Sequence, residues 1–170
     1  MTSSPSSLKG FGISKPKPKD MNIKNRLAEI QVRYSTKIKK EDRVQVKSSE
    51  DAFRVLIEIF DQTTLEYQEI FYVLLLNRAN EVLGYKCVSK GGISGTVVDT
   101  RQILGLALKC NAVSIILSHN HPSGNKLPSQ TDIDLTKKIK DGGALLDIMV
   151  LDHLIVTMEG YYSLADEGII

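Results

Sequence analysis

Strand-sized apolar runs alternate with segments of helical periodicity along most of this chain. "EIFYVLLLN" (69–77), "AVSIILSHN" (112–120) and "IMVLDHLIVT" (148–157) are almost continuously apolar, which is typical of buried strands. "EVLGYKCVS" (81–89) follows the first run after a short turn and is expected to be its hairpin partner. The alternating stretch "AEIQVRYS" (28–35) predicts one more strand.

Three further segments predict amphipathic helices. They are "SSEDAFRVLIEIF" (48–60), "DTRQILGLALKCN" (99–111) and "SQTDIDLTKKIKDGG" (129–143). Each opens on a Ser or Asp that can cap a helix, and the third is expected to end at its glycine pair. The residues after 160, "YYSLADEGII", are interpreted as a tail. The order β-α-β-β-α-β-α-β predicts an α/β fold with a mixed sheet and helices on its faces.

Charge divides the chain into two parts. Residues 1–44 hold 11 Lys/Arg and 4 Asp/Glu, a net +7, whereas residues 45–170 hold 11 and 16, a net −5. Three prolines fall within the first 18 residues. We therefore predict a basic, partly flexible arm over 1–44 and a folded domain over 45–170. Such an arm attracts nucleic acid weakly, but it lacks interleaved aromatic residues, so a solvated tail is the favoured interpretation.

The sequence gives no sign of a membrane or an oxidising compartment. Its longest apolar runs fall far short of the roughly 20 residues that span a bilayer. The N-terminus lacks the apolar region of an export signal. Cys87 and Cys110 are too few for a disulfide framework. We expect a cytoplasmic protein with no membrane partner.

Two of the three histidines stand one residue apart in "LSHNHPSGNKLPSQTD" (117–132). His119 and His121 follow a buried run, and alternate residues of an extended chain point to the same side, so their imidazoles can converge. Ser129 is expected to cap the next helix, which places Asp132 in its first turn. Two His and one Asp leave one position of a tetrahedral zinc open for water, as in catalytic zinc sites.

Each of these residues also has a purely structural interpretation. Ser-x-x-Asp resembles a capping box, Pro-Ser-Gly-Asn is ordinary turn composition, and a lone histidine at a strand end is commonly a hydrogen-bonded surface residue. The joint pattern H-x-H-x7-S-x2-D is a stronger signal, because chance produces it on the order of once in several thousand chains of this length.

"HNHPSGNKLPSQTD" resembles the JAMM metalloprotease motif of MPN domains. With "VLDHLIV" and "YYS" further on, the chain is similar to the RadC branch from about Val44 to its end. The resemblance implies a three-layer mixed sheet flanked by helices, similar to the cytidine deaminases. It also implies zinc as cofactor on His119, His121 and Asp132, with Ser129 steadying the tetrahedral intermediate or the bound water.

The resemblance further implies a general base on an upstream strand. Glu69, which opens "EIFYVLLLN", is the best match, and Glu66 and Glu58 compete with it. The expected function is zinc-dependent hydrolysis of peptide or isopeptide bonds in a peptide or protein substrate, with metal-activated water attacking the carbonyl and Glu69 as general base.

Two other functions stay open. One is a DNA-repair-associated or partner-binding module with a non-catalytic metal site, which the RadC likeness suggests. RadC-like chains commonly carry a helical region ahead of this domain, and the basic arm that stands there instead disfavours a DNA role. The other is a zinc deaminase, which needs H-x-E and P-C-x-x-C, whereas this chain has His121 in place of the Glu and no Cys pair. The third histidine, His153, is expected to pack as a structural residue.

Overall fold

The computed structural model describes residues 28, 33–91 and 97–170. The chain divides into two units, residues 1–32 and 33–170, and the fold below is that of the second. Most of the predicted basic arm, residues 1–27 and 29–32, lies outside the described residues, as does half of the strand predicted over 28–35. The described residues of that stretch belong to no strand, so the prediction is wrong for them. Tyr34 meets the sheet through its hydroxyl, which donates to the carbonyl of Leu83, and not through backbone pairing.

Five strands form one mixed sheet in the order β2-β1-β3-β4-β5. They are β1 (Ile70–Leu76), β2 (Val82–Lys90), β3 (Ser114–Asn120), β4 (Met149–Thr157) and β5 (Gly160–Ser163). β3 and β4 pair in parallel, and the other neighbours are antiparallel. The predicted mixed sheet is confirmed. The predicted tail instead begins with β5, because the chain turns back after Thr157 through Gly160 at φ 123° and pairs with β4.

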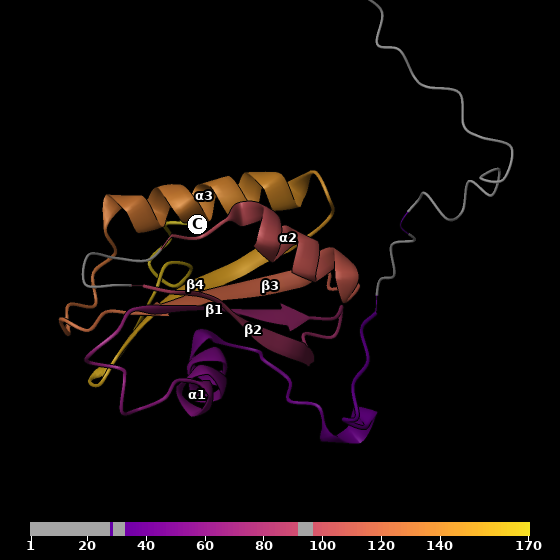
Figure 1. Ribbon diagram of the computed structural model, residues 1–170, viewed down its shortest axis with the longest axis horizontal. Coiled ribbons are helices and arrows are strands. Elements are labelled where there is room, and N and C mark those ends of the chain that lie inside the picture. The colour runs from indigo at the N-terminus through magenta and orange to yellow at the C-terminus, as the bar shows by residue number, and fades with distance from the viewer. Residues whose placement is uncertain (1–27, 29–32, 92–96) are drawn as a thin grey trace, which may run out of the picture. The chain divides into compact units, whose positions relative to one another are not determined.

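Helices cover both faces of the sheet. α1 (Ser49–Ile59) lies on one face, and α2 (Thr100–Lys109) and α3 (Gln130–Ala144) lie on the other (Figure 1). A short 3-10 helix, η3 (Lys40–Asp42), precedes α1. The three layers agree with the predicted three-layer α/β architecture.

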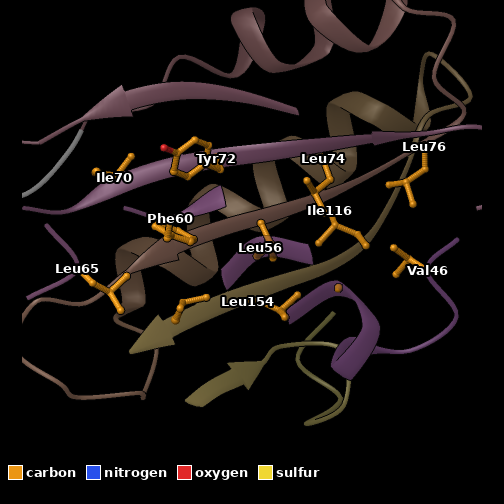
Figure 2. Close-up of a cluster of buried hydrophobic side chains, with 12 residues drawn as sticks. Val46, Leu56, Phe60, Leu65, Ile70, Tyr72, Leu74, Leu76, Ile116 and Leu154 are labelled. Atoms are coloured by element: carbon orange, nitrogen blue, oxygen red, sulfur yellow. The ribbon is translucent and has the colours of Figure 1, made fainter. Parts of the chain in front are cut away.

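The sheet separates two apolar cores. Ile70, Tyr72, Leu74 and Leu76 point from one side of β1 toward α1, and Figure 2 shows them in a row among the side chains of that core. The alternate residues Phe71, Val73 and Leu75 point toward α2 and α3. Both faces of β1 and β3 are therefore buried, which explains why their sequences are continuously apolar and do not alternate.

The predicted capping residues begin all three α-helices. Ser48, Asp99 and Ser129 are the N-caps, and each side chain accepts a backbone N–H of the first turn. The predicted end of α3 at the glycine pair is wrong, because the helix continues through Gly142 and Gly143 to Ala144. A Cβ at Gly143 would lie 2.5 Å from the carbonyl oxygen of Ile148, so this glycine serves close packing and not helix termination.

Among the described residues, every helix is too short or too polar to cross a membrane. Cys87 and Cys110 are both free.

Candidate metal centre

The end of β3 brings His119 and His121 together. His119 is buried within the strand, on the face that carries Leu117 and α3, and His121 follows two residues later. The two rings lie 4.7 Å apart between centroids, and their Nε2 atoms are 2.9 Å apart. The predicted convergence of alternate side chains is therefore present.

Asp132 reaches the histidines from the first turn of α3. Its Oδ2 accepts the backbone N–H of Ser129 at 2.7 Å and the Ser129 hydroxyl at 2.6 Å, and its own N–H donates back to Ser129 Oγ. This capping box fixes the carboxylate. Asp132 Oδ1 then lies 3.4 Å from His119 Nε2, and Oδ2 lies 3.7 Å from His121 Nε2. The carboxylate that completes the capping box is thus also a candidate metal ligand.

The three side chains fit a metal ion. One ligand atom from each of His119, His121 and Asp132 lies within 4.8 Å of the others. Ligands at about 2.0–2.2 Å from zinc lie roughly 3.3 Å apart in a tetrahedron. The Nδ1–H of His121 donates to the carbonyl of Asn125 at 2.6 Å, so its Nε2 can offer a lone pair to the ion. Two imidazoles and one carboxylate suit a divalent transition metal.

The charges of the metal-free site are unevenly distributed. Burial lowers the pKa of His119 to about 4, against a smaller opposing effect of Asp132. The hydrogen bond with Asp132 raises the pKa of His121 above its ordinary 6.5, and the charge of Glu69 acts in the same direction. Burial favours the protonated form of Asp132, but its hydrogen bonds to His121 and Ser129 and the charge of His119 together lower its pKa. Neutral His119 has a lone pair ready to coordinate a metal, whereas the raised pKa of His121 makes its proton harder for a metal to displace.

Glu69 lies immediately before β1 and beside the histidine pair. β1 and β3 are antiparallel with Phe71 opposite His119, and the same register extended two residues beyond the paired residues would set Glu69 opposite His121. The influence of Glu69 on the pKa of His121 agrees with this position. Of its competitors, Glu66 is exposed in the preceding loop, and Glu58 is exposed on α1, across the sheet.

Asn120, between the two histidines, was not identified from the sequence. It is fully buried, and its side chain points away from the site. Its Oδ1 accepts the N–H of Ile70 at 2.7 Å, and its Nδ2 donates to the carbonyls of Leu65 and Gln68 at 2.7 and 2.9 Å. Asn120 therefore holds the loop that delivers Glu69. The sequence signal that could have pointed to Asn120 was its position between the two histidines of H-x-H.

His153 lies closer to the site than predicted. It is fully buried, as expected of a structural histidine, but its Nε2 is 2.8 Å from His119 Nδ1. Burial, reinforced by the neighbouring His119, lowers its pKa well below 6.5, so the ring is neutral. The parallel pairing of Leu117 with His153 across β3 and β4 places it on the same face as His119.

The comparisons with known proteins agree on one family. The family model of the RadC-like JAB domain matches residues 46–169. A UPF0758 protein of Flavobacterium johnsoniae is 49% identical over 125 residues, which cover 74% of this chain and 53% of that protein. A UPF0758 protein of Clostridium botulinum is 39% identical over 145 residues, which cover 85% of this chain and 62% of that protein.

A third relative, a UPF0758 protein of Clostridium beijerinckii, is 36% identical over 144 residues, covering 85% of this chain and 62% of that protein. The chain thus spans between half and two thirds of the length of these relatives. The matched region includes the described sheet and the histidine pair with Asp132. By sequence and by fold, this chain belongs to the RadC-like JAB domain family.

Proposed function

We propose that this domain is a zinc-dependent hydrolase of amide bonds, acting on a peptide or isopeptide bond of a peptide or protein substrate. The observation that carries the proposal is the convergence of His119, His121 and Asp132 around one point, with Glu69 near enough for its charge to act on His121. Three protein ligands leave a fourth position for chemistry, whereas structural zinc sites are closed by four.

Zinc at this point would supply a Lewis acid that activates water and polarises a substrate carbonyl. In our proposal the Glu69 carboxylate takes a proton from the attacking water and delivers it to the leaving nitrogen. Ser129 has one hydroxyl proton, which it donates to Asp132 Oδ2. That hydrogen bond orients the ligand carboxylate and leaves Oδ1 for the metal. To assist a developing oxyanion, the hydroxyl must rotate away from Asp132.

Metal content and turnover together test the proposal. We expect about one zinc per chain in protein purified without chelator or metal-affinity resin, and loss of that zinc in His121→Ala. The loaded protein is then screened against peptides and isopeptide-linked conjugates. Absence of zinc after incubation with the metal at neutral pH would reject the proposed centre.

Glu69→Gln tests the general base within that experiment. The amide keeps the size of the side chain but cannot accept the proton, so we expect unchanged zinc content and a turnover reduced roughly 100-fold or more. Glu66→Gln, an exposed change in the same loop, is the matched control and should retain turnover. Equal turnover of Glu69→Gln and wild type would assign the base elsewhere.

A further inference from the structure

A chain of three short contacts runs from α3 through β4 to the histidine pair. Thr136 Oγ1 lies 2.6 Å from the carbonyl oxygen of Asp132 and 2.6 Å from His153 Nδ1. The other nitrogen of His153, Nε2, lies 2.8 Å from His119 Nδ1. Thr136, His153 and His119 are all buried, so solvent does not compete for these contacts.

The protons of these three hydrogen bonds have one consistent arrangement. A carbonyl oxygen only accepts hydrogen bonds. The 2.6 Å contact is therefore favourable only if Thr136 donates its single hydroxyl proton to the carbonyl oxygen of Asp132. Thr136 must then accept from His153, which places the ring proton of His153 on Nδ1. Its Nε2 carries the lone pair and accepts from the Nδ1–H of His119. His119 is left with its lone pair on Nε2, the atom that faces Asp132.

We infer that Thr136 and His153 are positioning residues that set the tautomer and ring orientation of His119 for metal binding. This inference rests on the proposed function only in taking His119 as a metal ligand. A histidine ligand is commonly fixed by a hydrogen bond at its other nitrogen, and loss of such a partner weakens metal binding by about 10–100-fold. The partner is here a second, neutral histidine, itself oriented by a threonine.

The surroundings hold both rings in this arrangement. The Phe71 ring lies nearly parallel to the His119 ring, with 5.9 Å between the ring centroids and 5° between the ring planes. It meets the His153 ring edge-on, at a centroid distance of 5.5 Å and an interplanar angle of 61°. Asp132 and Thr136 are four residues apart on α3. A single helical turn therefore supplies both a candidate ligand and the threonine that begins the series of hydrogen bonds to His119. His121 has a different device, since its Nδ1 donates to a backbone carbonyl in the following turn.

Thr136→Val tests the inference with little change of volume, and Thr136→Ser is the control that keeps the hydroxyl. We expect Thr136→Val to bind zinc about tenfold or more weakly in competition with a chelator, and Thr136→Ser to stay within about threefold of wild type. Imidazole ¹⁵N spectra of the metal-free proteins should show His119 protonated on Nδ1 in wild type and Thr136→Ser, and a mixture of tautomers in Thr136→Val. Thermal melts establish that each variant is folded.

His153→Gln and His153→Leu form a second matched pair. The glutamine carbonyl can accept from His119 while its amide donates to Thr136, so zinc affinity should be partly retained, whereas leucine should lose it. A wild-type spectrum with His119 protonated on Nε2, or equal zinc affinity in Thr136→Val and Thr136→Ser, would overturn the inference. If wild type binds no zinc, the proposed function fails, but the spectra of the metal-free protein still decide the tautomer.

Discussion

At the scale of single residues, the H-x-H motif contributes the buried residue between its two histidines as well as the histidines themselves. The residue between the histidines points to the opposite face of the sheet, as alternation along an extended chain requires. There Asn120 uses its amide group to fasten the loop that ends at Glu69. One tripeptide therefore provides two candidate ligands on one face and secures the candidate base from the other.

Asn120→Asp should be strongly destabilising. It keeps an acceptor for Ile70 but removes both donors, and it sets a buried carboxylate against the carbonyls of Leu65 and Gln68. We expect a loss of roughly 3 kcal/mol or more in the free energy of unfolding, measured with urea. Asn125→Asp is the control, because its exposed Oδ1 accepts from Leu127 and aspartate preserves that bond, so stability should change by less than about 0.5 kcal/mol. Similar losses in both variants would refute the role of the Asn120 amide in holding the loop that ends at Glu69.

The buried histidines predict how stability depends on pH in the metal-free protein. Burial lowers the pKa of His119 to about 4 and that of His153 well below 6.5, whereas unfolded histidine titrates near 6.5. Between about pH 4 and 6.5 the unfolded state binds more protons at both positions, so the free energy of unfolding should rise with pH. His119 alone contributes on the order of 3 kcal/mol across this window.

His121 acts in the opposite sense. Its raised pKa stabilises the folded state below about pH 6.5, and that stabilisation is lost as pH rises through its folded value. Because the His121 contribution is lost only above about pH 6.5, it does not oppose the two lowered histidines below that pH, and urea unfolding with chelator present should show a net rise from about pH 4.5 to 6.5. His153→Gln should make this rise shallower. A flat or falling profile in wild type would contradict the prediction.

At the scale of elements, α3 positions several of the groups that make up the candidate site. Its N-cap is Ser129, its first turn contains Asp132, and its second turn presents Thr136 to His153. The other end of the helix is anchored at Gly143, where the backbone passes directly over Ile148 at the entrance to β4. A shift at this glycine displaces the helix relative to the strands that hold the histidines.

Gly143→Ala and Gly142→Ala should therefore behave differently although they are adjacent. The new methyl at 143 would lie 2.5 Å from the carbonyl oxygen of Ile148, which is backbone and cannot move aside, and we expect a loss of about 1–3 kcal/mol. At 142 the nearest atom, 3.0 Å away, is the flexible end of Leu104, and alanine gains about 0.5–1 kcal/mol of helix propensity. Denaturant unfolding of both variants checks this, and equal losses would count against close packing at Gly143.

At the scale of the whole molecule, the candidate centre joins parts that are distant along the chain. The strand end with His119, the helix start with Asp132 and the strand with His153 meet only when the sheet and α3 are assembled. A metal that binds these groups together binds the folded state and not the unfolded chain. Binding should therefore appear as stability.

Zinc at 100 times its dissociation constant should stabilise the fold by about 2.7 kcal/mol. For a domain of this size, that corresponds to a rise in Tm of roughly 5–10 °C. Differential scanning fluorimetry with and without zinc measures the shift, which chelator should reverse and His121→Ala should abolish. A shift of equal size in His121→Ala would mean that zinc binds somewhere else.

The sequence by itself determined the local features of this protein. Continuous apolar runs gave the buried strands, Ser48, Asp99 and Ser129 gave the helix starts, and the spacing of His119, His121 and Asp132 gave the candidate ligands. These are short-range properties, set by backbone periodicity and by hydrogen bonds within one turn. Only the tertiary structure decided the role of Asn120, the contact of His153 with His119, the need for glycine at 143 and the pairing of β5. Each of these depends on groups that pair or pack across different elements, and no pattern within a single segment records which distant partner it will meet.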